Sequence, residues 1–252
     1  NKAVQLAQGQ YICILNSDDW LPQKAAEVAV HNLRDKPKHA LLLSSATVHH
    51  PNETKSGWDP TLVHPGSYFT CANVCHNAIY ANREVYTLSG PYDSSCRIAS
   101  DFKWIMRCLE AGARFVYTKE KTVHYSIGGI SSNRNIHELE YIRIVRDRFP
   151  FLSKADAHHL FCCFFVFIHH QGSHMDYDEP ENYMRFLGDI CIRYADQPDF
   201  IQAVAWASMS SLRHPFDAEG KIASRMFHIL VSFLHRSPGL YRLAKRIYNS
   251  LS

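Results

Sequence analysis

The sequence lacks a hydrophobic run long enough to cross a membrane. Its longest apolar stretch, residues 160–168, is much shorter than the about 20 residues that a transmembrane helix requires. No secretory signal pattern opens the chain. We therefore expect a cytoplasmic protein with reduced thiols.

Strong charge and paired cysteine motifs are lacking as well. The net charge is only +3, and no basic patch interleaved with aromatic residues is present, so we expect no nucleic-acid partner. The eight cysteines fit neither a disulfide framework nor a zinc site, since the one ligand-like cluster, residues 71–76, lacks a second half. With 252 residues, 46% of them hydrophobic, the chain is typical of a folded enzyme of one large or two small domains.

The most informative segment that is present joins an apolar run to acidic residues. Residues 10–15 predict a buried strand, and residues 16–19 (Asn-Ser-Asp-Asp) follow it directly. Ligands of open α/β sheets collect beyond the carboxyl ends of the strands, and carboxylates there commonly hold Mg²⁺ or Mn²⁺ together with substrate phosphates. The alternative is that the two Asp residues only cap a helix over residues 22–34.

Three short segments at the start of the chain carry a family resemblance. Residues 1–3 (Asn-Lys-Ala), 7–12 (Ala-Gln-Gly-Gln-Tyr-Ile) and 15–19 (Leu-Asn-Ser-Asp-Asp) together resemble the central block of the family-two, inverting glycosyltransferases of the GT-A fold. In that family several strands precede the block, whereas here it begins at residue 1. The resemblance therefore implies an α/β, N-terminally truncated GT-A layer that lacks its first strands and is inactive by itself.

The same resemblance implies roles for four residues. Asp18 would hold a divalent cation, Mn²⁺ or Mg²⁺, and Asn16 would approach the nucleotide ribose. Asp19 would support the loop or the waters of the metal. His76 stands where the family has a His followed by a polar residue and a short strand, so we expect it to face the substrate. A half-buried structural histidine is the alternative.

A second block surrounds a predicted helix at residues 100–111. Its apolar residues recur at helical spacing, Ser100 is expected as the N-cap, and Gly112 suits the C-terminal stop. Asp101 lies in the first turn, where the helix dipole favours the ionised carboxylate. The resemblance implies that Asp101 is the general base. It also implies that Ser100, in the place of the family's usual Glu, is a substrate-binding residue. Stabilisation of the helix start alone is the alternative.

A third block follows the strand predicted at residues 114–117. Gly128 and Gly129 resemble the family's post-catalytic loop, and glycines allow close approach of the backbone to a substrate. His124 is the candidate for a second ligand of the metal or the diphosphate, a role that would favour Mn²⁺ over Mg²⁺. A histidine that only donates hydrogen bonds is the alternative.

Residues 136–252 carry no recognised motif and predict a mostly α-helical C-terminal region, separate from the catalytic domain at residues 1–135. The last helix, residues 240–251, has a basic side and an apolar stripe. Such a helix either lies peripherally on an anionic membrane, at its inner face, or packs on the preceding helix.

In the catalytic part we further expect a strand at residues 40–48 and an exposed loop at residues 49–67. The helices that we expect in the C-terminal region span residues 137–148, 154–170, 179–195 and 199–212, with a final pair from residue 218 onward.

We therefore predict a metal-dependent, inverting glycosyltransferase. It would move a sugar from a nucleotide-diphosphate donor to a hydroxyl of a saccharide or lipid-linked acceptor, in the synthesis of a surface polysaccharide or glycolipid. Two alternatives remain open. One is a nucleotidyltransferase-like enzyme, which would use the same arrangement of carboxylate and metal, and the other is a non-catalytic remnant that binds nucleotide-sugars.

Overall fold

The computed structural model describes residues 1–127, 134–166 and 180–212. It divides into two compact units. The first comprises residues 1–63 and 72–140, and the second comprises residues 64–71 and the chain from residue 141 onward. The first unit contains the sheet and the second is helical.

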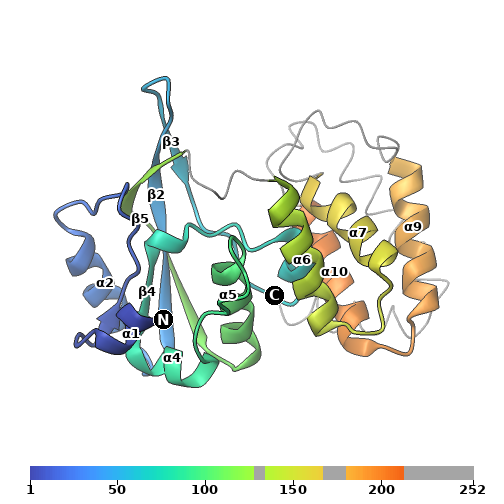
Figure 1. Cartoon of the computed structure of the whole chain (residues 1–252), viewed down its shortest axis with the longest axis horizontal. Helices are drawn as coiled ribbons and strands as arrows, with labels where there is room; N and C mark the ends of the chain where they lie inside the picture. Colours follow the sequence, from blue (N-terminus) through green and yellow to red (C-terminus); the bar gives the residue numbers. More distant parts are fainter. Residues whose placement is uncertain (128–133, 167–179, 213–252) are drawn as a thin grey trace. The chain divides into compact units, whose positions relative to one another are not determined.

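A five-stranded mixed sheet is built around β2 (Ala40–His49), as Figure 1 shows. The strand β5 (Arg114–Ser126) runs parallel to β2 along one edge. On the other edge, β4 (Ile79–Asn82) and β3 (Lys55–Trp58) pair with successive parts of β2, both antiparallel. The two-residue strand β1 (Tyr11–Ile12) pairs with β4.

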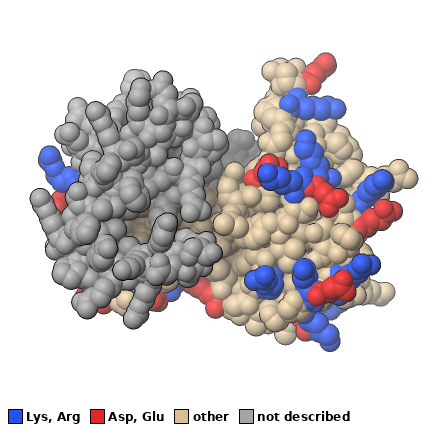
Figure 2. All heavy atoms as spheres, turned by 180° about the vertical axis from the view of Figure 1, so that it is seen from behind, with Lys and Arg blue, Asp and Glu red and all other residues tan. Residues whose placement is uncertain are grey.

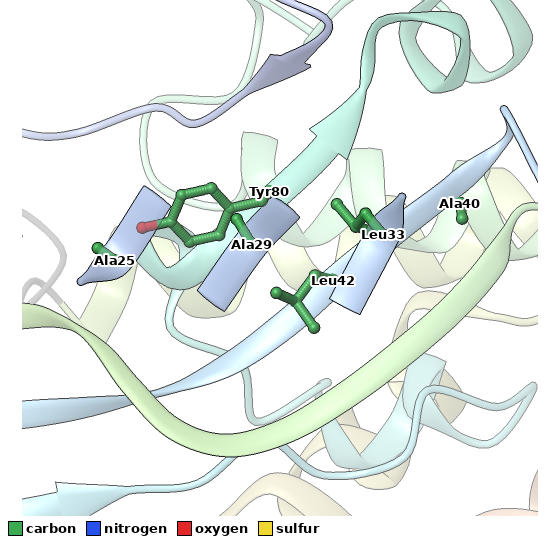
Figure 3. Close-up of a cluster of buried hydrophobic side chains, with 6 residues drawn as sticks. All are labelled: Ala25, Ala29, Leu33, Ala40, Leu42 and Tyr80. Carbon is green, nitrogen blue, oxygen red and sulfur yellow. The ribbon is translucent and has the colours of Figure 1, made fainter. Parts of the chain in front are cut away.

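The central strand begins with a continuous apolar run at residues 40–43, and this run is buried, as expected for a strand that is covered on both faces. Residues 41–43, all leucine, are fully buried. The helix α2 (Ala25–Leu33) contributes three core residues at a spacing of four, so that its small side chains face the sheet. Figure 3 shows this core cluster, which consists of Ala25, Ala29, Leu33, Ala40, Leu42 and Tyr80.

Four further helical segments complete the first unit. They are α1 (Lys2–Leu6), the 3₁₀ turn η1 (His76–Ala78), α4 (Arg83–Ser89) and α5 (Ser100–Glu110). The helix α5 ends before Gly112, whose φ of 76° is the left-handed conformation that glycine adopts at helix C-termini. This termination is as predicted from the sequence.

The second unit is formed by helices around an aromatic core. Its elements are α3 (Ser67–Thr70), α6 (Arg134–Arg148, which begins in the first unit), α7 (Lys154–Phe161), the π-helical turn η3 (Cys162–Val166), α9 (Pro180–Arg193) and α10 (Pro198–Leu212). Phe69 stacks on Phe149 and Phe164 and meets the edge of Phe200. No helix in the described ranges has the length and hydropathy needed to cross a bilayer.

The predicted α/β layer followed by helices is confirmed, but several boundaries differ. The strand expected at residues 10–15 pairs only over Tyr11–Ile12, because the chain then turns toward η1. The helix expected from residue 22 starts at Ala25. The loop expected at residues 49–67 contains β3 and the start of α3.

Of the expectations for the helical region, one is met only in part and one falls on residues that the structure does not describe. The helix expected at residues 154–170 gives way to a π-helical turn after Phe161. The final pair of helices, with the basic amphipathic segment at residues 240–251, lies outside the described residues.

Over the described surface seen in Figure 2, basic and acidic side chains are intermixed, in agreement with the small net charge.

Candidate active site

The acidic loop after β1 is fixed in place by the side chain of Asp19. This carboxylate is 8% exposed. Its Oδ1 accepts a hydrogen bond from the Ser126 amide at 2.7 Å, and its Oδ2 accepts one from Asn77 Nδ2 at 2.5 Å. Asp19 thereby connects the loop to the end of β5 and to η1.

Burial raises the pKa of the Asp19 carboxyl above its ordinary value. The hydrogen bond from the Ser126 amide opposes this rise, the neighbouring charge of Asp18 adds to it, and His76 opposes it. Because both carboxylate oxygens already have protein partners, Asp19 supports the loop.

Asp18 differs from its neighbour in exposure and in contacts. Its side chain is exposed and makes no hydrogen bond or salt bridge within the described residues. Its backbone carbonyl accepts a hydrogen bond from Ser126 Oγ at 3.0 Å, which fixes the backbone beneath the free carboxylate. Asp18 is therefore the carboxylate of this loop that is available to a cation.

His124 lies beside this loop, in contact with Trp20 and His49. The backbones of Trp20 and His124 form an antiparallel bridge through two hydrogen bonds, of 3.3 and 2.9 Å. The two rings stack at a centroid distance of 5.0 Å and an angle of 14°. His124 Nδ1 is 3.0 Å from His49 Nε2. The Nε2 atom of His124 therefore remains without a hydrogen-bond partner among the described residues.

The pKa of His124 lies below the ordinary histidine value. Burial is the main cause, and the nearby His49, Lys55 and Lys121 act in the same direction. A neutral imidazole with one committed nitrogen is a suitable donor to a transition metal.

The described residues fit a divalent cation only in part. Within these ranges no three His, Cys, Asp or Glu side chains are grouped so that they could hold a metal ion. Asp18 and His124 both flank the bridge between the loop and β5, but no contact joins their side chains. A cation at Asp18 would need most of its oxygen ligands from phosphates and water, as is usual for Mg²⁺ at nucleotide sites.

A second group of polar residues links Asn16, His76 and Asp101. Asn16 Nδ2 lies 3.1 Å from His76 Nε2, and because an amide nitrogen only donates, His76 Nε2 is the acceptor. The ring proton of the neutral histidine is then on Nδ1, which lies 3.5 Å from Asp101 Oδ2. The other oxygen of Asp101 accepts a hydrogen bond from the Phe102 amide at 2.7 Å.

Asn77 connects the two groups and is not among the residues predicted from the sequence. Its side chain is fully buried. While Nδ2 donates to Asp19, Oδ1 accepts a hydrogen bond from the Asn16 amide at 3.2 Å. The available signal was a polar residue placed directly before the apolar strand at residues 78–81, where a buried amide requires partners.

The start of α5 corrects the expected role of Ser100. Ser100 is the first residue of the helix, and the N-cap position is held by Ala99, whose side chain has no capping atom. The amides of residues 97–99 donate instead to the carboxylate of Glu140. The sequence analysis missed Glu140 as well, because its partners are more than 40 residues away.

The predicted glycines, the cysteines and the grouping of the predicted site residues compare with the structure as follows. Gly128 and Gly129 lie outside the described residues. All eight cysteines are free thiols in the structure. Of the predicted site residues that are described, Asn16, His76 and Asp101 form one connected group. Asp18, Asp19 and His124 lie where the loop meets β5.

Comparison with known proteins gave matches among solved structures alone. No family model matches the chain, and no curated protein matches it. Among solved structures, the chain is similar to S. aureus TarS, with 14% sequence identity and a TM-score of 0.46. The similarity covers 89% of this chain and 41% of that one. The chain thus spans about two fifths of the length of TarS.

Proposed function

We propose that this chain carries catalytic and donor-binding residues of a metal-dependent, inverting glycosyltransferase of the GT-A type. The observation that supports it most is the connected group Asn16, His76 and Asp101, set beside a loop whose Asp18 carboxylate is free. A hydrogen-bonded carboxylate near a second, cation-binding carboxylate is what transfer of a sugar from a nucleotide-diphosphate donor requires.

Asp101 is the proposed general base. Its Oδ1 is held by the Phe102 amide and its Oδ2 faces His76 Nδ1, and each oxygen keeps a further lone pair for the acceptor hydroxyl. As that proton moves to Asp101, the acceptor oxygen bonds to the anomeric carbon. The bond from this carbon to the diphosphate oxygen breaks with its electron pair, so the nucleoside diphosphate leaves and the configuration inverts.

The loop at residues 16–20 is the proposed contact with the donor. A divalent cation held by Asp18 would supply the positive charge that stabilises the departing diphosphate. Asp19 would keep the loop against β5, and Asn16 would present its carbonyl oxygen to the ribose. His124 has only Nε2 to offer a metal, and its use would favour Mn²⁺.

The competing function is a domain that binds nucleotide-sugars without turnover. Purified full-length protein is incubated with a panel of nucleotide-diphosphate sugars, Mn²⁺ or Mg²⁺, and saccharide acceptors, while release of nucleoside diphosphate and donor binding are both measured. Metal-dependent release supports the transferase. Binding without release identifies the non-catalytic domain.

Two substitutions test the assigned residues. We expect Asp101→Asn to lower turnover by about 10²–10⁴-fold, the usual contribution of a general base, and to leave donor binding unchanged. We expect Asp18→Ala to abolish metal-dependent donor binding. Glu110→Gln, at the exposed end of the same helix α5, is the control. Near-normal turnover in Asp101→Asn would exclude Asp101 as the base.

The proposed acceptor is a saccharide or lipid-linked saccharide on a route to a surface polysaccharide or glycolipid. A lipid-linked acceptor would make peripheral membrane contact through residues 240–251 useful. Co-sedimentation with anionic vesicles tests this contact. Unchanged binding after deletion of residues 237–252 would contradict it.

A further inference from the structure

One buried carboxylate, that of Glu140 in α6, organises the chain just before α5. Glu140 is 8% exposed. Its Oε1 accepts a hydrogen bond from the Arg97 amide at 2.6 Å, and its Oε2 accepts bonds from the Ile98 and Ala99 amides, both at 2.9 Å. Three consecutive backbone N–H groups thus converge on one side chain that lies about 40 residues further along the chain.

These contacts fix the chain immediately before α5, where the local sequence provides no capping side chain. The N-cap residue of α5 is Ala99, which has no side-chain acceptor. Helix starts leave N–H groups unsatisfied, and a negative charge there is favoured by the helix dipole. Glu140 supplies both an acceptor and a charge, and hydrogen bonds to an ionised acceptor are stronger than neutral ones.

The segment that Glu140 holds leads directly to Asp101, two residues after Ala99. His137, one turn before Glu140 on α6, lies near both acids. Burial lowers the pKa of His137, while the charges of Asp101 and Glu140 act in the opposite direction. The carboxylates of Asp101 and Glu140 therefore both lie near His137, although no hydrogen bond between the two is seen in the described residues.

We propose that Glu140 is a positioning residue for Asp101. It holds the start of α5 where Asp101 Oδ2 faces His76 and Oδ1 receives the Phe102 amide. This inference rests on the proposed function, in which Asp101 is the base. Because a displacement of about 1 Å at a reacting group can cost about 10²-fold in rate, fixing the helix start contributes to turnover rather than to donor binding.

The test compares Glu140→Gln with Glu110→Gln in the full-length protein. Gln keeps the size of the side chain but removes the charge and replaces one acceptor by a donor that opposes the backbone amides. We expect kcat to fall by about 10–100-fold with the KM for the donor within about twofold. Glu140→Asp retains the charge and should recover part of the loss. Glu110→Gln should match the wild type.

A double-mutant cycle separates positioning from a merely structural role. If Glu140 acts through Asp101, adding Glu140→Gln to Asp101→Asn produces no further loss of kcat. Multiplying losses, or an unchanged kcat in folded Glu140→Gln, would overturn the proposal. Near-normal turnover in Asp101→Asn alone would instead refute the proposed function.

Amide hydrogen exchange gives a readout that needs no activity. In Glu140→Gln, or in Glu140→Asp if the first variant does not fold, we expect the amides of residues 97–99 and of Phe102 to exchange at least about tenfold faster. Loss of protection at residues 97–99 with Phe102 unchanged would show that the Asp101 contact does not depend on Glu140, and would overturn the inference.

Discussion

The side-chain amide of Asn77 donates a hydrogen bond of 2.5 Å to the carboxylate of Asp19, across 58 residues of sequence. Both groups are buried. The same amide accepts the backbone N–H of Asn16 through its oxygen, so one side chain satisfies both ends of the acidic loop. The placement of the free Asp18 carboxylate depends on this contact, because Asp18 lies between the two anchored residues.

We expect Asn77→Ala to destabilise the protein by about 2–4 kcal/mol. The substitution leaves an oxygen of the buried Asp19 carboxylate and the Asn16 amide without their partners, and unsatisfied buried polar groups are costly. Chemical denaturation measures the change in the free energy of unfolding. Gln23→Ala, at an exposed position, is the control and should cost less than about 0.5 kcal/mol. Equal costs for the two variants would contradict the anchoring role of Asn77.

The two neighbouring acids should respond differently to substitution by asparagine. Asp19→Asn puts an amide NH₂ group against either the Ser126 amide or the Asn77 amide, both donors, and should cost about 1–3 kcal/mol of stability. Asp18→Asn should change stability by less than about 0.5 kcal/mol, since its side chain is exposed, yet weaken metal-dependent donor binding. Thermal unfolding and donor titration with Mn²⁺ measure the two effects. The reverse order of stabilities would contradict the roles assigned to the two acids.

The sequence predicts this fold best where one element determines its own structure. The strand β2 was placed within one residue because its apolar run needs no particular partner to be recognised. The helix α5 was recognised from its own apolar spacing and from Gly112. In contrast, β1 is short because Cys13 and Asn16 donate hydrogen bonds to Asn77 in η1, and no local pattern predicts that turn.

Residues whose roles depend on distant partners were the ones missed. Glu140 looks like any helical glutamate until the amides of residues 97–99 are placed against it. His49 meets His124 only because the parallel register of β2 and β5 brings them diagonally opposite. Such contacts are set by strand order and register, which periodicity within one segment does not determine.

Buried His64 should make the stability of the protein depend on pH. Burial lowers the pKa of His64 from 6.5 to about 4, so the unfolded chain takes up a proton at a pH where the folded chain does not. Stability is therefore fully present above about pH 6.5 and is lost as the pH falls toward 4. His64→Phe keeps an aromatic ring against Trp206, on which His64 stacks, and removes the titration. Between about pH 7 and pH 5 the wild type should lose about 2 kcal/mol more than the variant. Parallel curves of unfolding free energy against pH for the two proteins would contradict this.

Gly66 should tolerate no side chain, because the backbone of α10 lies directly against it. A Cβ atom at Gly66 would be 2.2 Å from the Ala207 nitrogen and 2.8 Å from the Ala203 carbonyl oxygen. These are backbone atoms within a helix, so they do not move aside as the end of a flexible side chain would. We expect Gly66→Ala to cost about 1–3 kcal/mol through overpacking, measured as a lower midpoint of thermal unfolding. Gly57→Ala in β3 is the matched control, since a Cβ there meets nothing within 4 Å. The control should be neutral or slightly stabilising, because alanine restricts the unfolded chain more than glycine does. Equal midpoints for the two variants would show that α10 does not pack on residue 66 as closely as the structure indicates.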